Sequence, residues 1–110
     1  MKYCIPISGN TPEAKMDPRF GRAEFFLFYD SDSGETDIVE NSNAANPSGV
    51  GVASAQLMVD RGIDKVITTK VGPKAGGVLS AAGITVLTGV DGAGSLPASA
   101  LIEKIKTGDI

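Results

Sequence analysis

Two stretches, RGIDKVITT at residues 61–69 and AGITVLTG at residues 82–89, share one pattern. Each contains a glycine typical of a helix end, continues through isoleucine into a short apolar strand, and then reaches threonine. Two successive helix–strand units predict parallel strands that are joined by right-handed crossovers. The second half of the chain therefore indicates a parallel α/β arrangement.

The first half of the chain predicts three strands without a helix between them. KYCIPIS at residues 2–8 is typical of a buried strand, and EFFLFYD at 24–30 is typical of a strand by its aromatic content. ETDIVEN at 35–41 alternates as a more exposed strand would. The short turn at 31–34 predicts an antiparallel hairpin of the second and third strands.

Three helices are predicted in the second half. The first lies within residues 46–62, where Asn46 or Ser48 can cap it and Gly62 can end it. The second lies within residues 72–83, with Pro73 in its first turn, and Ser95 can open the last helix. The inward-facing stripes are expected at Val50, Ala53 and Leu57, at Ala75, Val78, Leu79 and Ala82, and at Ala98, Leu101, Ile102 and Ile105.

The order of these elements predicts one α/β domain over residues 1–110. A hairpin followed by crossovers indicates a mixed five-stranded sheet in the order 3-2-1-4-5, with only strand 2 antiparallel and with three helices on its faces. This is the outline of a ribonuclease H-like fold.

Composition argues against several classes of function. A net charge of −3 argues against a general nucleic-acid binder. No apolar stretch approaches the roughly 20 residues of a membrane span, and the N-terminus lacks a signal-peptide core, so we expect a cytoplasmic protein. One cysteine and no histidine make a protein-held zinc or iron–sulfur site improbable, and no metal-ligating residues are predicted.

The predicted topology places four loops at one edge of the sheet. Open α/β sheets bind ligands outside the carboxyl ends of their strands, and this edge would be basic in an acidic protein. Lys15 belongs to the same loop as the two arginines of the stretch RFGR at residues 19–22. Two helix N-termini would add free N–H groups. The predicted anion-binding residues are Asn10, Arg19, Phe20, Gly21, Arg22, Ser48, Gly49, Lys70, Gly72 and Lys74.

Each of these residues has a simpler interpretation. Arg19 and Arg22 can pair with Asp17 and Glu24, and Phe20 can anchor the loop in the core. The glycine-rich start of the first helix and the lysines can be ordinary surface features. Cys4 is expected as a packed small hydrophobe in a central strand. The first strand offers no carboxylate at its middle, so a metal-dependent nuclease is the least favoured function.

Four motifs resemble the dinitrogenase iron–molybdenum cofactor biosynthesis family, which includes NifX, NafY and the C-terminal part of NifB. They are MKYCIPISGN, RFGRAEFFLFYD, NPSGVGVASAQLMVDRGIDKVI and VGPKAGGVLSAAGITV, and together they cover nearly the whole chain. The resemblance implies a ribonuclease H-like fold and binding of an anionic iron–sulfur–molybdenum cofactor or its precursors. It also implies protein partners in cofactor assembly.

The sequence departs from this family at two places. The family often has histidine directly before FGRA, where this chain has Arg19, and in the glycine-rich segment, where it has Pro47 and Ser48. These departures weigh against direct ligation of iron and leave the basic, glycine-rich scaffold in place. We therefore expect a non-catalytic binding or carrier protein for an anionic iron–sulfur/molybdenum-type metallocofactor or its precursor. The alternative is a binding or regulatory module for a small anion without metal.

Overall fold

A computed structural model describes residues 1–42, 49–88, 90 and 95–110. The described elements are β1 (Lys2–Ile7), η1 (Phe20–Arg22), β2 (Phe25–Asp30), β3 (Thr36–Glu40), α1 (Val50–Asp60), β4 (Lys65–Ile67), α2 (Pro73–Ala81), β5 (Thr85–Leu87) and α3 (Ala98–Lys106). Among the described residues, no helix is long and apolar enough to cross a membrane.

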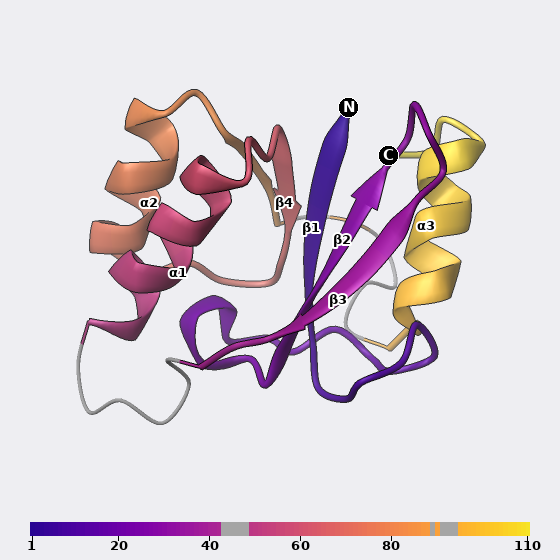
Figure 1. The fold of residues 1–110 in the computed structure, drawn as a ribbon, viewed down its shortest axis with the longest axis horizontal. Coiled ribbons are helices and arrows are strands. Elements are labelled where there is room, and N and C mark those ends of the chain that lie inside the picture. The colour runs from indigo at the N-terminus through magenta and orange to yellow at the C-terminus, as the bar shows by residue number, and fades with distance from the viewer. Residues whose placement is uncertain (43–48, 89, 91–94) are drawn as a thin grey trace.

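The strands form one mixed sheet in the order β3-β2-β1-β4-β5. β2 pairs antiparallel with both β1 and β3, whereas β4 pairs parallel with β1 and with β5. The predicted ribonuclease H-like topology is confirmed in strand order and direction. Figure 1 shows that α1 and α2 lie on one side of this sheet and α3 on the other.

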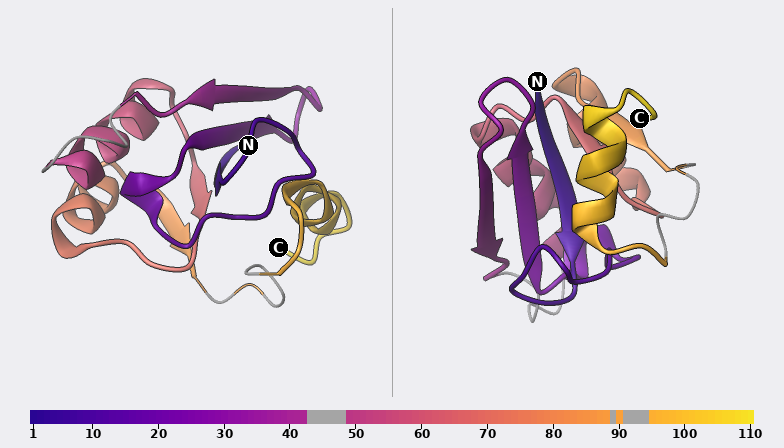
Figure 2. Two further views of the ribbon diagram at one scale, coloured as in Figure 1. Left: turned by 90° about the horizontal axis from the view of Figure 1, so that it is seen from below. Right: turned by 90° about the vertical axis from the view of Figure 1, so that its right-hand side faces the viewer.

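Both faces of the central strands are buried, which explains their nearly continuous apolar sequences. On the α3 face, Tyr3, Ile5 and Ile7 pack with Leu27, Tyr29 and the stripe of α3. On the opposite face, Cys4, Phe26 and Phe28 pack with residues of α1 and α2. The two further views in Figure 2 show the same layers, with the sheet between the helix pair and α3.

The first loop crosses the carboxyl ends of the strands instead of projecting into solvent. Met16 forms an isolated bridge with Ile7, Lys15 forms one with Pro97, and Arg19 forms one with Lys70. The N–H of Asp17 also donates to the carbonyl oxygen of Pro6, at 2.9 Å. The loop is therefore held at the ends of β1 and β4 and beside the start of α3.

The helix starts differ from the sequence expectations. Gly49 is the N-cap residue of α1, with φ 75° and no side-chain cap, and the predicted caps Asn46 and Ser48 lie outside the described residues. Ser95 does not open α3, because the N-cap residue is Pro97. The first two N–H groups of α3 donate instead to backbone carbonyls of the first loop, those of Ala14 and Pro12.

The inward stripes are confirmed in part. All four predicted positions of α3 are buried. In α2, Ala75 and Leu79 are buried, whereas Ala82 is exposed and follows the helix. In α1, Val50 is buried as predicted, whereas Ala53 and Leu57 are half-buried, with Leu57 packed against the core. The buried residues of α1 are Val50, Ser54, Ala55 and Met58.

Candidate functional site

A cavity of about 460 Å³ lies at the carboxyl edge of the sheet, and we call it the basic cavity. Three segments that are far apart in the sequence form it: the first loop with η1, the start of α1, and the segment that leads from β4 into α2. Its lining residues are Pro18, Arg19, Phe20, Gly21, Arg22, Gly49, Val50, Gly51, Val52, Lys70, Gly72, Pro73, Lys74 and Ala75. Its volume lies within the range of roughly 300–1,000 Å³ of typical small-molecule and cofactor sites.

Phe20 and Gly21 fix η1 against the rest of the fold. The Phe20 side chain is only 2% exposed and its ring centroid lies 6.0 Å from that of Phe26. Its interpretation as a core anchor is confirmed. A Cβ on Gly21 would lie 2.8 Å from the Cα and from the N of Gly51, so the two backbones meet without room for a side chain. The purple turn beside α1 in Figure 1 is η1.

A buried asparagine supports the same turn, and the sequence analysis missed it. The Asn41 side-chain amide donates to the carbonyl oxygens of Gly21, at 3.1 Å, and of Ala23, at 2.8 Å. Asn41 is 6% exposed and directly follows β3. Only its contact with a turn about 20 residues earlier reveals the role, and no local pattern signals it.

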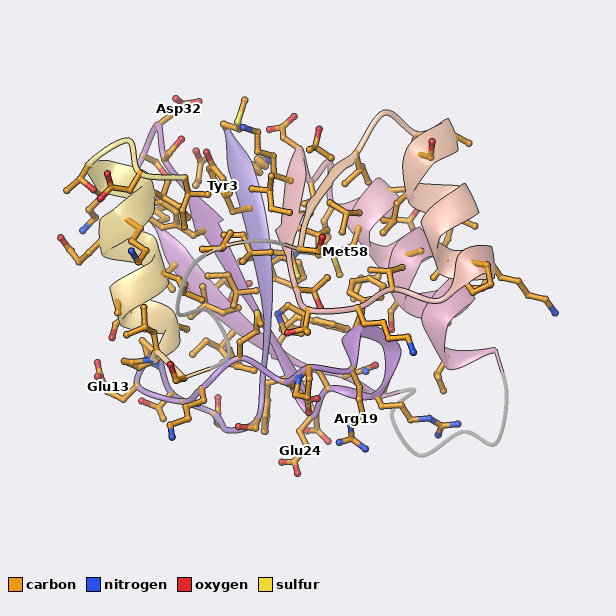
Figure 3. The ribbon with its side chains drawn as sticks, turned by 180° about the vertical axis from the view of Figure 1, so that it is seen from behind. Tyr3, Glu13, Arg19, Glu24, Asp32 and Met58 are labelled. Carbon is orange, nitrogen blue, oxygen red and sulfur yellow. The ribbon has the colours of Figure 1, made fainter. Side chains whose placement is uncertain are left out.

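Arg19 lies on the cavity wall and pairs with a buried carboxylate. Its Nε lies 3.3 Å from Asp17 Oδ1 and its Nη2 lies 3.4 Å from Asp17 Oδ2. The Arg19 side chain is 66% exposed, whereas that of Asp17 is 4% exposed. The simpler interpretation of Arg19, an ion pair with Asp17, is thus confirmed while the residue still lines the cavity. Figure 3 shows Arg19 at the end of the molecule opposite Asp32.

Two helix N-termini contribute to the cavity. The N-cap residues of α1 and α2, Gly49 and Gly72, both line it. The first N–H groups of a helix have no partner within that helix, and the helix dipole makes this end partly positive. Both ends therefore favour an anion at the place where Lys70 and Lys74 add full positive charges.

Eight of the ten predicted site residues line this cavity. They are Arg19, Phe20, Gly21, Arg22, Gly49, Lys70, Gly72 and Lys74. Asn10 is exposed and lies outside the lining, and Ser48 lies outside the described residues. Lys15 does not join the cavity either, because its bridge to Pro97 holds it beside α3.

The chemistry of the described lining is cationic and apolar. Pro18, Val50, Val52, Pro73 and Ala75 join the four cationic side chains, and no carboxylate, thiol, imidazole or hydroxyl side chain is among the described lining residues. Within the described part of the chain, no three potential metal-ligating residues gather. The arrangement can hold a negatively charged ligand with apolar surface, and its described residues offer no side-chain ligand for a metal.

Cys4 does not line the basic cavity. Its side chain is fully buried in the core beneath α1 and α2, and burial raises the pKa of its thiol far above the ordinary value. A neutral thiol is a weak nucleophile and a poor metal ligand. The interpretation of Cys4 as a packed hydrophobe is confirmed by its position.

Comparisons with known proteins agree with this architecture. An uncharacterised protein of Methanocaldococcus jannaschii is 36% identical over 89 residues, which are 78% of this chain and 72% of that protein. The apo form of the orange protein from Desulfovibrio gigas superposes with a TM-score of 0.85 at 28% identity, over 97% of this chain and 88% of that one. A NifB-like protein from Thermotoga gives 0.78 at 30% identity, with the same two coverages.

A family comparison gives the relationship directly. The family model described as "Dinitrogenase iron-molybdenum cofactor" matches residues 1–107, which is nearly the whole chain. The two solved structures share the overall fold of this chain. The chain therefore belongs to the dinitrogenase iron–molybdenum cofactor family.

Proposed function

We propose that this protein is a non-catalytic binding or carrier protein for an anionic metallocofactor of the iron–sulfur/molybdenum type, or for its precursor. The basic cavity is the observation that carries the proposal, because it joins four cationic side chains and two helix N-termini around an apolar surface. Its volume exceeds what a phosphate-sized ion needs and suits a cofactor. Family membership supports the choice of an iron–molybdenum type ligand.

The residues of the cavity suit transport better than permanent attachment. The described lining residues offer electrostatic and apolar contacts but no side chain that ligates a metal. A cofactor held in this way can leave without the breaking of a bond between a metal and the protein. The carrier would pass its ligand to protein partners in cofactor assembly.

Anaerobic titration with isolated iron–molybdenum cofactor tests the proposal. We expect cofactor to co-elute with the wild-type protein in gel filtration, with molybdenum and iron measured in the protein fraction. The double variant Lys70→Gln/Lys74→Gln removes two charges from the cavity and should weaken binding and flatten its salt dependence. The control Lys15→Gln/Lys106→Gln removes two exposed lysines outside the lining and should bind as the wild type does.

A second candidate function is a small-anion or regulatory module without metal. The two helix N-termini that line the cavity favour it, since the free N–H groups and the dipole at such an end suit phosphate. The same titration with inorganic phosphate separates the two candidates. Binding of phosphate but not of cofactor would replace the carrier proposal with the second candidate. If both lysine double variants bound cofactor equally well, the basic cavity would not be the binding site in either case.

A further inference from the structure

The contacts of Asp17 give it a role in the basic cavity that the lining residues alone do not reveal. Its N–H donates to the carbonyl oxygen of Pro6 at 2.9 Å, which fixes it at the end of β1. Its Oδ1 accepts the backbone N–H of Arg19 at 2.9 Å, and both carboxylate oxygens face the Arg19 guanidinium. With 4% of its surface exposed, this carboxylate has a fixed place and a fixed partner.

The Arg19 main chain is held as well. It forms a parallel bridge with Lys70, which lines the same cavity. The side chain is thus constrained at both ends, although 66% of it is exposed. An exposed arginine usually samples many rotamers, so this constraint reduces the conformational entropy that is lost when a ligand binds.

The pair also changes what Arg19 offers to a ligand. Asp17 accepts from Nε and from one Nη, which uses two of the five guanidinium N–H donors. The charge of the pair is zero, so Arg19 adds directed N–H groups and little net attraction. Within the described residues, Lys70 and Lys74 form no ion pair, and they supply uncompensated charge to the cavity.

We propose that Asp17 is a positioning residue that holds the Arg19 guanidinium in one orientation on the wall of the basic cavity. In this orientation Arg19 recognises the ligand through hydrogen bonds of fixed direction, whereas Lys70 and Lys74 attract it by charge. This inference rests on the proposed function, because it concerns the same ligand. It assigns a role to a buried acidic residue that does not itself line the cavity.

A double variant with unchanged net charge, called the isoelectric variant, separates the effect of directed hydrogen bonds from the effect of charge. Asp17→Asn/Arg19→Gln removes one negative and one positive charge together, and asparagine keeps an acceptor for the backbone N–H at position 19. The probe is isolated iron–molybdenum cofactor, titrated anaerobically at two salt concentrations. Lys74→Gln is the charge control, and thermal unfolding of each variant checks that the fold is retained.

We expect the isoelectric variant to bind the cofactor about tenfold more weakly, since charge-assisted hydrogen bonds from one guanidinium are lost. Its salt dependence should equal that of the wild type, whereas Lys74→Gln should show a flatter one. Equal affinities of the isoelectric variant and the wild type would overturn the inference. So would a loss of affinity that disappears at high salt, because it would reveal a charge effect.

Arg19→Lys keeps the inference testable if the double variant does not fold. Lysine retains the positive charge but lacks the planar fork that pairs side-on with a carboxylate. We expect this variant to lose about tenfold in affinity as well, and wild-type affinity would overturn the inference. A wild-type protein that binds no cofactor would overturn the proposed function instead, whereas normal wild-type binding with an unaffected isoelectric variant would overturn only the inference about Asp17 and Arg19.

Discussion

At Gly21, the backbone of η1 lies directly against the backbone of α1, and this contact can be tested by a single methyl group. A Cβ at this position would lie 2.8 Å from two backbone atoms of Gly51, which cannot move as a flexible side chain would. We expect Gly21→Ala to lower the free energy of unfolding by about 1 kcal/mol or more, measured by urea denaturation.

Gly77 provides a matched control for this change. It lies within α2, is exposed, and has nothing within 4 Å of its would-be Cβ. Alanine is the better helix former, so Gly77→Ala should raise the free energy of unfolding by about 0.5–1 kcal/mol. Wild-type stability of Gly21→Ala, with the control behaving as expected, would show that η1 can move away from α1.

The buried thiol of Cys4 predicts a dependence of stability on alkaline pH. Burial raises the pKa of the folded thiol, whereas the unfolded chain keeps a value near 9.0. Below that value both states hold the proton and the thiol contributes its full stability. As the pH rises above it, the unfolded chain loses the proton first, so stability falls by up to about 1.4 kcal/mol per pH unit.

Denaturation at pH 7.5 and pH 10 measures this effect. Since lysines and tyrosines also titrate in alkali, the relevant quantity is the difference between the wild type and Cys4→Ala at each pH. We expect the variant to be less stable at pH 7.5, because of the small cavity, and to lose less stability at pH 10. An equal loss in both proteins would mean that the thiol ionises as easily in the folded state.

At the scale of elements, Asn41 connects the end of β3 to η1 and thus to the wall of the basic cavity. Its amide donates to two backbone carbonyl oxygens, in a part-buried bond to Gly21 and a buried bond to Ala23. We expect Asn41→Ala to lower the free energy of unfolding by about 1–3 kcal/mol. It should also weaken ligand binding, because the turn that carries Arg22 loses its support.

Gln56→Ala is the control for this prediction. Gln56 also donates a side-chain amide hydrogen bond, to Asp60 at 2.9 Å, but on the exposed face of α1. An exposed hydrogen bond of this kind contributes little, so its loss should change stability by less than about 0.5 kcal/mol. Similar effects of the two substitutions would indicate that the Asn41 contacts do not hold the turn.

The helices show which element orientations a sequence can predict. In α3, charged and polar residues alternate with apolar ones at helical spacing, and every predicted inward position is buried. In α1, VGVASAQLMV is apolar or small on nearly all sides, and the buried face is shifted from the predicted one. Such a helix lies against both the sheet and α2, so packing, and not the pattern, selects its orientation.

For the whole molecule, burial predicts an order of local stability. β1 and β2 are covered on both faces and lie inside the sheet, whereas β5 is a three-residue edge strand. In native-state hydrogen exchange we expect the amides of β1 and β2 to exchange last, near the rate of global unfolding, and those of β5 and α2 to exchange through smaller openings. Equal protection of β5 and β1 would contradict this order.

The sequence by itself determined the strand order, the strand directions and the edge at which the candidate site lies. These follow from local signals: repeated helix–strand units, a short hairpin turn and apolar runs of fixed length, which leave few allowed topologies. Eight of the ten predicted site residues line one cavity for the same reason, since carboxyl ends of parallel strands meet at one edge.

Only the tertiary structure decided the burial of Asp17, the role of Asn41 and the exclusion of Asn10 from the basic cavity. In the sequence Asp17 looks like an ordinary loop residue and Asn41 like the last residue of an exposed strand, yet both are buried, with partners that packing brings to them. Buried polar groups must find hydrogen-bond partners, and those partners come from whichever segments the fold places beside them. Sequence spacing carries no record of such contacts, because they form between surfaces that exist only after the chain has folded.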